Sequence, residues 1–289
     1  RTAFIGLGAL GAPMAANLLA AGVPLWVHNR TASTAEPLLK AGAQWAASAT
    51  EAAAAAECLC LCLSDDAAVQ QVLAAASPGL QPGSLVIDFS TISPATSQAL
   101  AAALANQGVH YIDAPVTGGT EGARSGTLSV LVGAEPAALE RAKPLLEIVG
   151  GTITHLGPVG AGQQAKAVNQ VLVAGSYAAV AEALALAQRL ELPIAALLAA
   201  LRPGAAGSWA LQHRADHMLA GDYPLGFKLS LHRKDLAIAL AAAANIDLEL
   251  PISAAVAAIE DALLANGHGD CDVSVLAEWF RTSREPLRD

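Results

Sequence analysis

The stretch Thr2-Ala3-Phe4-Ile5-Gly6-Leu7-Gly8-Ala9-Leu10-Gly11 decides the fold of this chain. Residues 2–5 form a short apolar run typical of a strand, and helical periodicity follows over 11–21. Between them stands the pattern G-x-G-x-x-G, in which the first glycine permits a tight turn, the second admits a pyrophosphate, and the third lets helix and strand pack. The N–H groups at the start of the helix favour the same anion. The alternative is an ordinary glycine-rich turn, but we predict dinucleotide binding by Gly6, Leu7, Gly8, Ala9, Leu10 and Gly11.

The residues after the second expected strand, 25–28, predict which dinucleotide is bound. NAD-binding sites usually carry Asp or Glu here to hold the ribose 2′-hydroxyl, whereas the first acid in this chain is Glu36. Arg30 offers a forked cation for a 2′-phosphate, and Asn29 and Thr31 offer further hydrogen-bonding groups. The alternative is that Arg30 is only a solvated surface residue. We therefore expect the cofactor to be NADP(H).

Short apolar runs alternate with helical patterns through the first half of the chain. Further strands are expected at 58–63, 85–88, 109–113 and 152–156, and the alternation is typical of a parallel sheet with helices on both faces. After a cluster of breakers at 157–162 only helical periodicity remains, starting with a long run over 163–190. The sequence thus predicts an α/β chain: an N-terminal Rossmann-type dinucleotide-binding domain, residues 1–161, and an all-α C-terminal domain, residues 162–289, joined by a long interdomain helix.

Composition excludes several classes of protein. The chain has 289 residues and a net charge of −9, without a Lys/Arg cluster, so no nucleic-acid partner is expected. The most apolar run, 167–181, contains polar residues, and the N-terminus resembles a strand, so we expect neither a membrane span nor a signal peptide. Cys58, Cys60 and Cys62 alternate on one strand face; we favour buried reduced thiols of a cytoplasmic protein over a metal cluster. The long apolar helices predict a homodimer or homotetramer formed through the helical domain.

Two further groups of residues carry the chemistry. Lys166 is the one Lys, Arg, Asp or Glu between Glu147 and Glu182, and Asn169 and Gln170 share its helix face. Such a lysine can simply extend to water, but burial would depress its pKa and make it a usable proton donor. The second group is Thr117-Gly118-Gly119 at the end of an expected strand. Its hydroxyl and N–H groups suit a small anion, although a plain Gly-Gly turn is the alternative.

Taken together, these motifs resemble the β-hydroxyacid dehydrogenase family, which includes 3-hydroxyisobutyrate dehydrogenase and tartronate semialdehyde reductase. The resemblance covers nearly the whole chain. Beyond the glycine loop it rests on D-A-P-V-T-G-G at 113–119, G-A-x-x-G-T-L at 122–128, G-x-G-x-x-x-K-x-x-N at 160–169 and the Gly-Phe…Leu-His-x-Lys-Asp form at 226–235. The last form and Lys-x-x-Asn-Gln are most similar to the tartronate semialdehyde reductase branch.

This resemblance implies an NADPH-dependent oxidoreductase that reduces a small semialdehyde or oxo acid, such as tartronate semialdehyde, glyoxylate or succinic semialdehyde, to the hydroxy acid. It implies that Lys166 is the general acid/base and that Asn169 and Gln170 orient the substrate or Lys166. It implies that the turn 117–119 holds the substrate carboxylate. The other residues it implies are Leu63, Ser64, Thr91, Phe227 and Lys234 at the cofactor, and Trp209 and Asp235 at the substrate, Asp235 also orienting Lys234. No metal is implied.

Three departures from the family pattern leave alternatives open. Thr117 stands where Ser is usual, Leu10 where Met is common, and Gln170 where many members have a second Asn. The last weakens, without removing, the alternative of a 3-hydroxyisobutyrate or similar β-hydroxy acid dehydrogenase that works in the oxidative direction. A second alternative is reduction of a C=N bond, as in imine reductases, but these enzymes usually lack the lysine at position 166. A third is a decarboxylating enzyme similar to 6-phosphogluconate dehydrogenase, whose helical half is longer than the one here. An NADPH-binding scaffold, the non-enzymatic alternative, would be marked by loss of Lys166.

Overall fold

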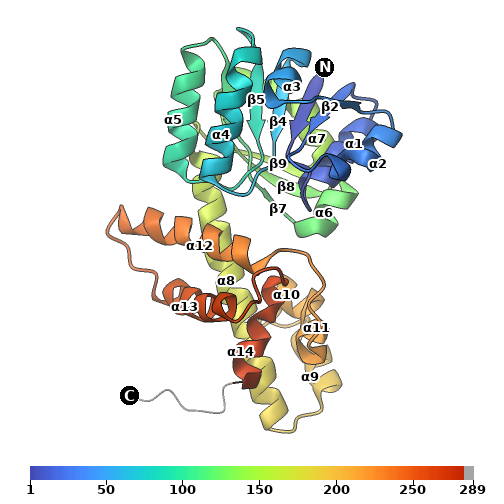
Figure 1. Ribbon diagram of the computed structural model, residues 1–289. Helices are drawn as coiled ribbons and strands as arrows, with labels where there is room; N and C mark the ends of the chain where they lie inside the picture. The colour runs from blue at the N-terminus through green and yellow to red at the C-terminus, as the bar shows by residue number, and fades with distance from the viewer. Residues whose placement is uncertain (283–289) are drawn as a thin grey trace. The chain divides into compact units, whose positions relative to one another are not determined.

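The computed structural model describes residues 1–282 and divides after Lys166 into unit 1, residues 1–166, and unit 2, which begins at Ala167. Residues 283–289 of the predicted C-terminal domain lie outside the described residues. Unit 1 contains one nine-stranded sheet (Figure 1). Its strands are β1 (Thr2–Ile5), β2 (Leu25–His28), β3 (Gln44–Trp45), β4 (Cys58–Leu61), β5 (Leu85–Asp88), β6 (His110–Asp113), β7 (Val116–Thr117), β8 (Leu128–Gly133) and β9 (Gly150–Gly157).

The strand order places the chain's first strand in the middle of the sheet. The order is β3-β2-β1-β4-β5-β6-β8-β7, with β9 paired to β8, and β1 to β6 are mutually parallel. The direction of winding therefore reverses at β1, between β2 and β4. Ligands of open parallel sheets bind outside the carboxyl ends of the strands at such a reversal. The predicted Rossmann-type α/β fold is confirmed.

The expectation of a wholly parallel sheet is wrong beyond β6. Strand β8, which was not among the predicted elements, runs antiparallel to β6 and β7, and β9 runs parallel to β8. Strands β6 and β8 meet at one register pair, Asp113 with Gly133. A Cβ at position 133 would overlap the Asp113 carboxylate, so the absence of a side chain lets the second part of the sheet join the first.

Helices cover both faces of the sheet (Figure 1). On one face, Phe4, Val27 and Ile87 pack under α1 (Gly11–Ala20), α2 (Glu36–Lys40), α6 (Gly119–Ser125) and α7 (Pro136–Val149). On the other, Ile5 and Leu59 pack under α3 (Ala49–Ala55), α4 (Asp66–Ala76) and α5 (Pro94–Ala105). Because strand side chains alternate between faces, the central strands β1, β4 and β5 are buried on both sides.

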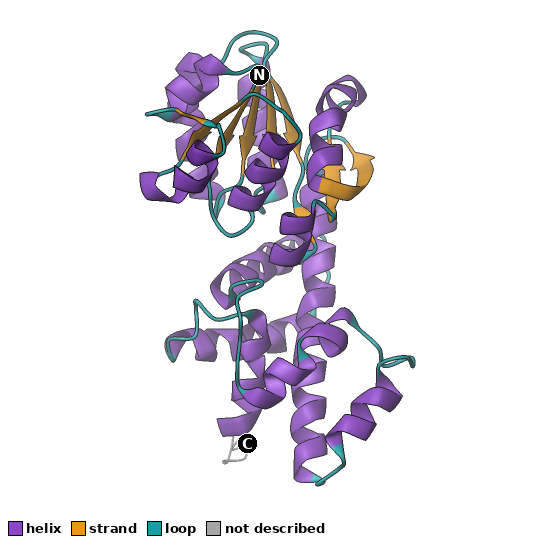
Figure 2. Cartoon of the chain, turned by 90° about the vertical axis from the view of Figure 1, so that its right-hand side faces the viewer, coloured by secondary structure: helices purple, strands orange, loops and turns teal. Residues whose placement is uncertain are grey.

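Over its described residues unit 2 contains helices and loops. The strands, drawn in orange in Figure 2, all belong to unit 1. Helix α8 (Ala161–Arg189) begins in unit 1 and continues through unit 2. The others are α9 (Ile194–Leu201), α10 (Trp209–His213), α11 (Ala215–Ala220), α12 (Leu229–Ala244), α13 (Pro251–Ala265) and α14 (Leu276–Thr282).

Helix α8 is long and apolar enough to be a candidate membrane span by length and composition, contrary to the expectation from its polar residues. The most apolar 18-residue window has a mean hydropathy of 1.5, and 39% of that window is buried. A core helix of a soluble protein passes the same test. In unit 2, one face of α8 does lie in a hydrophobic core, through Ala174, Tyr177, Ala181 and Leu184.

A carboxylate lies fully buried at the end of β5. The Tyr111 hydroxyl donates to Asp88 Oδ2 (2.8 Å), and the Ser90 N–H donates to Asp88 Oδ1 (2.9 Å). Burial raises the pKa of Asp88 to about 6 in spite of these hydrogen bonds, and the charge of Asp113 on the next strand adds to the rise. Ionisation of Asp88 therefore works against folding.

Replacement of this group changes how stability depends on pH. The folded pKa of Asp88 lies above its ordinary value of 3.8, so its favourable contribution is complete below about pH 4 and is lost as the pH rises through about 6. We expect Asp88→Asn to remove this loss, so that the free energy of unfolding of the variant gains about 2 kcal/mol on wild type between pH 4 and pH 7. Urea unfolding of both proteins across this range measures the gain, and parallel pH profiles would contradict it.

Candidate active site

The glycine loop joins β1 to α1 and leaves one side open. Gly6 has φ +98°, which favours glycine, and a Cβ there would overlap the Cys62 carbonyl oxygen. A Cβ on Gly11 would overlap the Gly6 carbonyl oxygen, whereas nothing lies within 4 Å of a Cβ built on Gly8. Helix α1 has no side-chain cap and no acid in its first turn. An open loop beside an uncapped helix start fits the pyrophosphate of a dinucleotide.

Asn29, expected to help bind a 2′-phosphate, also holds the glycine loop. Its Oδ1 accepts the Leu7 N–H (3.0 Å), and its Nδ2 donates to the Thr31 carbonyl oxygen (3.0 Å) and Thr34 Oγ1 (2.7 Å). The side chain therefore ties the glycine loop to the turn after β2. Arg30 and Thr31 lie exposed on that turn.

The predicted residues after β4 and β5 are linked by two residues that sequence reasoning missed. The Leu63 N–H donates to Ser90 Oγ (2.8 Å). The Gln163 side chain, 1% exposed, donates to the Ser90 carbonyl oxygen (2.8 Å) and accepts the Ile92 N–H (3.2 Å). Gln163 thus holds the backbone on both sides of Thr91. A glutamine at the start of a long apolar helix was the available signal. Ser64 is exposed beside Leu63, and its hydroxyl donates to a neighbouring carboxylate.

Asp113 at the end of β6 binds the start of α8. Its Oδ1 accepts the Gly160 N–H (2.7 Å) and its Oδ2 accepts the Gln163 N–H (2.9 Å). Burial raises the pKa of Asp113, and the N–H groups of Gly160 and Gln163 act in the opposite direction. A Cβ on Gly162 would lie 2.8 Å from Asp113 Oδ2. The first turn of α8 is therefore held against β6 by one carboxylate, a residue missed from sequence because its partners are distant in the chain.

Lys166 lies one turn further along α8 and contacts the same segment. It is 6% exposed, and its Nζ donates to the Val116 carbonyl oxygen (2.8 Å). Val116 directly precedes Thr117-Gly118-Gly119, where Gly118 and Gly119 have φ of 129° and 64° and lead into α6, a helix without a side-chain cap. The two groups singled out from sequence, the lysine and the Thr-Gly-Gly turn, thus come together within unit 1.

In unit 2, four predicted residues form one polar chain. Asn169 Nδ2 donates to Gln170 Oε1 (2.7 Å), and Gln170 Nε2 donates to Asp235 Oδ2 (2.7 Å). The other oxygen of Asp235 pairs with Lys234 Nζ at 2.9 Å. Because Gln170 and Asp235 are 1% and 3% exposed, this chain fixes their side chains, and Asp235 contacts Lys234 as the family resemblance implied.

Trp209 and Phe227 are connected through an ion pair that sequence reasoning missed. The Arg214 guanidinium carbon lies 4.7 Å from the centre of the Trp209 ring, which is 47% exposed as a residue. Arg214 pairs with buried Asp272 (3.4 Å). Asp272 in turn accepts the N–H groups of Gly226 (3.0 Å) and Phe227 (2.9 Å). The buried carboxylate of Asp272 therefore holds both the Arg214 side chain that lies over Trp209 and the backbone at Phe227.

The chain matches known proteins along nearly its whole length. Residues 1–157 match a family model described as the NAD binding domain of 6-phosphogluconate dehydrogenase, and residues 160–280 match one described as NAD-binding of NADP-dependent 3-hydroxyisobutyrate dehydrogenase. The chain is 37% identical to the 2-hydroxy-3-oxopropionate reductase of Escherichia coli, with 95% of each chain covered. It is 38% identical to the NAD-dependent L-serine dehydrogenase of Pseudomonas aeruginosa, over 96% of this chain and 97% of that one. The chain belongs to the β-hydroxyacid dehydrogenase family.

A solved member of the family has the same fold as this β-hydroxyacid dehydrogenase. The 3-hydroxyisobutyrate dehydrogenase of Mycobacterium tuberculosis with L-serine superimposes with a TM-score of 0.87 at 33% identity, over 98% of this chain and 99% of that one. The family resemblance inferred from the motifs is confirmed. The protein is accordingly an oxidoreductase that acts on a CH–OH or carbonyl group with a nicotinamide dinucleotide.

Loss of the Asp113 carboxylate tests whether it positions the lysine. In Asp113→Ala, the N–H groups of Gly160 and Gln163 lose their acceptor, which costs about 1–3 kcal/mol of stability for each group left unpaired. If Lys166 takes part in the reaction, we expect kcat to fall about a hundredfold, because a displacement of about 1 Å in a reacting group has that effect. Asp113→Asn, which keeps one acceptor oxygen, should lie between the variant and wild type. Circular dichroism and steady-state kinetics separate folding from catalysis, and a folded Asp113→Ala enzyme with wild-type kcat would refute the role.

Proposed function

We propose that this β-hydroxyacid dehydrogenase is an NADPH-dependent reductase that converts a small semialdehyde or oxo acid, of the tartronate semialdehyde, glyoxylate or succinic semialdehyde type, to the hydroxy acid. The observation that supports it most is the hydrogen bond from Lys166 to Val116. It brings a buried amine to the residue before a turn rich in N–H groups. A proton donor next to an anion-binding turn suits a substrate with a carbonyl and a carboxylate.

The residues of unit 1 divide the work of the reaction. The Thr117 hydroxyl and the N–H groups of Gly118 and Gly119 hold the substrate carboxylate. The Lys166 ammonium donates a proton to the carbonyl oxygen as negative charge develops there. An ammonium has three N–H donors, and the one taken by Val116 fixes its direction. A bound nicotinamide supplies the hydride.

The polar chain of unit 2 supplies orientation. Gln170 is held by Asp235, so we assign it to positioning, and we assign Asn169 to orienting Lys166 or the substrate through its amide oxygen. Lys234, paired with Asp235, supplies a cation for the cofactor. Trp209 and Phe227, held by Arg214 and Asp272, contribute apolar surface to the substrate and the cofactor.

The preference for NADP rests on Arg30. No acid stands directly after β2 to take a ribose 2′-hydroxyl, since the first one is Glu36, and Asn29 is engaged with the glycine loop. The exposed Arg30 can give charge-assisted hydrogen bonds to a 2′-phosphate. The family model that matches residues 160–280 is named for an NADP-dependent enzyme, whereas the Pseudomonas aeruginosa relative is NAD-dependent. Since relatives of both kinds match, we base the choice on Arg30.

Cofactor kinetics test this assignment. We expect wild-type enzyme to have a kcat/KM for NADPH at least about tenfold above that for NADH, and Arg30→Ala to lose this preference through a higher KM for NADPH. Arg30→Lys, which keeps the charge without the fork, should retain part of it. Equal use of both cofactors by wild type, or an unaffected KM in Arg30→Ala, would rule out this role for Arg30.

A reaction panel distinguishes the proposed function from a second candidate. The similarity to a serine dehydrogenase and to a structure with L-serine favours, as that candidate, oxidation of a β-hydroxy acid with Lys166 as the base. We expect NADPH oxidation to be fastest with one of tartronate semialdehyde, glyoxylate, succinic semialdehyde and methylmalonate semialdehyde. Faster NADP⁺ reduction with L-serine or 3-hydroxyisobutyrate would favour the second candidate. A cyclic imine is the control, and turnover of the imine alone would contradict both.

Lys166→Ala tests the proton donor. We expect its kcat to fall by about 10²–10⁴, as for loss of a general acid/base, while the Kd for NADPH from fluorescence titration stays near wild type. Lys143→Ala, which removes an exposed lysine on α7, is the matched control and should keep wild-type kcat. A near-normal rate in Lys166→Ala would remove this residue from the mechanism.

The state of the cysteines bears on location. All four, Cys58, Cys60, Cys62 and Cys271, are free thiols. Free thiols are typical of proteins in reducing compartments. We therefore propose that the enzyme works in the cytoplasm.

A further inference from the structure

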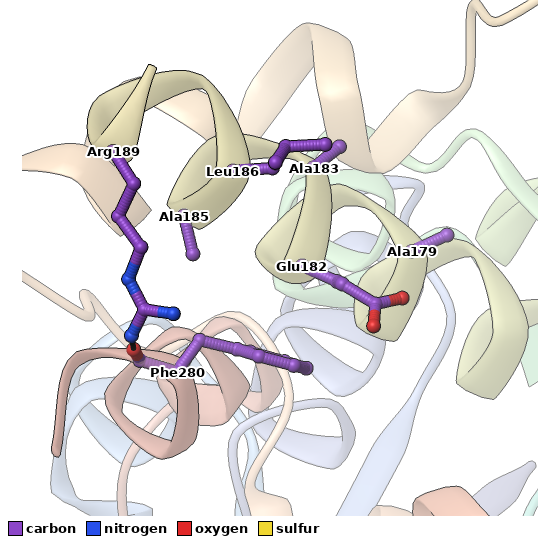
Figure 3. Close-up of a pocket in the computed structure, with 7 residues that line it drawn as sticks. All are labelled: Ala179, Glu182, Ala183, Ala185, Leu186, Arg189 and Phe280. Carbon is purple, nitrogen blue, oxygen red and sulfur yellow. Dashed lines mark hydrogen bonds between the residues drawn. The ribbon is translucent and has the colours of Figure 1, made fainter. Parts of the chain in front are cut away.

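Helix α8 carries different groups along its length. In unit 2, a hollow of about 480 Å³ lies between α8 and Phe280 (Figure 3). None of the residues that line it is a predicted site residue: Ala179, Glu182, Ala183, Ala185, Leu186, Arg189 and Phe280. The first two turns of α8 carry Gln163 and Lys166 of unit 1, and both side chains are buried. The reaction proposed above assigns a role to Lys166 and none to Gln163.

The Gln163 amide uses both of its polar groups on one short segment. Its Nε2 donates to the Ser90 carbonyl oxygen (2.8 Å), and its Oε1 accepts the Ile92 N–H (3.2 Å). Thr91, which the family resemblance implies at the cofactor, lies between these two contacts. Because two hydrogen bonds fix the orientation of the amide as well as its distance, Gln163 sets α8 against this segment.

The segment itself is held to the sheet by other residues. The Ser90 N–H donates to Asp88 Oδ1 (2.9 Å), and Ser90 Oγ accepts the Leu63 N–H (2.8 Å). Asp88 is the last residue of β5, and Leu63 follows β4. When the Gln163 amide is removed, we therefore expect the segment to keep its place on the sheet and to lose its link to α8.

The helix carries this link to Lys166. Gln163 and Lys166 are three residues apart, about 4.5 Å along the helix, and residues at this spacing are neighbours on one face. Lys166 Nζ donates to the Val116 carbonyl oxygen (2.8 Å). One turn of α8 thus contacts the segment around Thr91 through Gln163 and the residue before Thr117 through Lys166.

The proposed reaction needs these contacts at a fixed separation. The carbonyl carbon of the substrate accepts a hydride from the reduced nicotinamide, which is thereby oxidised, and the carbonyl oxygen accepts a proton from the Lys166 ammonium. Water then returns a proton to the neutral amine. Both transfers require reacting atoms about 3–3.5 Å apart. A shift of Lys166 relative to Thr91 would lengthen one of the two distances.

We propose that Gln163 is a positioning residue for this reaction, whose amide sets the Lys166 ammonium relative to the segment that carries Thr91. The inference rests on the proposed function, in which Lys166 is the proton donor. The alternative is that the amide only satisfies the buried Ser90 carbonyl oxygen and Ile92 N–H, and so stabilises the fold. The two roles differ in whether the effect of Gln163 on the rate depends on Lys166.

Gln163→Met tests the role, since methionine keeps the length of the side chain without the amide. We expect kcat to fall about a hundredfold, as for a displacement of about 1 Å, and the Kd for NADPH from fluorescence titration to stay within about threefold of wild type. The matched control is Gln164→Met at the next position of α8, which is exposed and should keep wild-type kcat. A folded Gln163→Met enzyme with wild-type kcat, beside a slow Lys166→Ala enzyme, would overturn the inference and leave the proposed function standing.

A double-mutant cycle separates positioning from a structural role. The Lys166→Ala background has no ammonium to position, so the addition of Gln163→Met should lower kcat by less than about threefold. A further loss of about a hundredfold in that background would mean that the two residues act independently, and would overturn the inference. Wild-type kcat in Lys166→Ala would instead refute the proposed function and the inference with it.

Amide hydrogen exchange on the cofactor-free enzyme tests the contact itself. The Ile92 N–H should exchange slowly in wild type and rapidly in Gln163→Met. Rapid exchange in wild type, or slow exchange in the variant, would overturn the proposal. If Gln163→Met does not fold, Gln163→Asn replaces it in both experiments. Asparagine is one methylene shorter and cannot reach Ser90 and Ile92 together, so kcat should still fall at least about tenfold, and wild-type kcat would again overturn the proposal.

Discussion

The start of α8 rests on the Asp113 carboxylate, and most of the candidate site depends on this contact. The first N–H groups of a helix have no partner within it, and here Gly160 and Gln163 donate to a buried carboxylate at the end of β6. The negative charge of Asp113 also interacts favourably with the positive end of the helix dipole. Two side chains of α8 depend on this position: Gln163 holds the loop around Thr91, and Lys166 holds Val116. One contact thereby positions Lys166, which we propose as the proton donor, relative to the turn that we assign to the substrate carboxylate.

Buried acids have the same use elsewhere in the molecule. Asp235 joins Lys234 to Gln170, and Asp272 joins Arg214 to the backbone at Phe227. Charged residues make up 14% of the chain, and burying an acid is unfavourable unless it is paired or accepts hydrogen bonds. Asp113, Asp235 and Asp272 are all paired or accept hydrogen bonds, and their partners are predicted site residues or lie close to them. The hydrogen bonds to Asp88 offset the cost of its burial less completely, since burial still raises its pKa.

Local sequence predicted the parts of the site that are continuous in the chain. The glycine loop follows from Gly6, Gly8 and Gly11 directly after a strand, and Lys166 stood out because no other charged residue lies near it in the sequence. The role of Asp113 could not be read in this way, because its partners are 47 and 50 residues away. Nothing local distinguishes a buried acceptor from an exposed acid.

Other differences have the same origin in long-range contacts. The link from Asn29 Oδ1 to the Leu7 N–H of the glycine loop could not be read from local sequence, because the two residues are 22 positions apart. The antiparallel direction of β8 beside β6 could not be predicted, because it depends on Gly133 meeting Asp113, which is distant in the chain.

Amide hydrogen exchange at Gly160 and Gln163, followed by NMR, tests the central contact most directly. If the Asp113 carboxylate holds the start of α8, both amides exchange as slowly as those in the middle of β6, although the segment before them is rich in glycine and proline. In Asp113→Ala they exchange rapidly while the β6 amides remain protected. Rapid exchange of both amides in the wild-type enzyme would contradict the account.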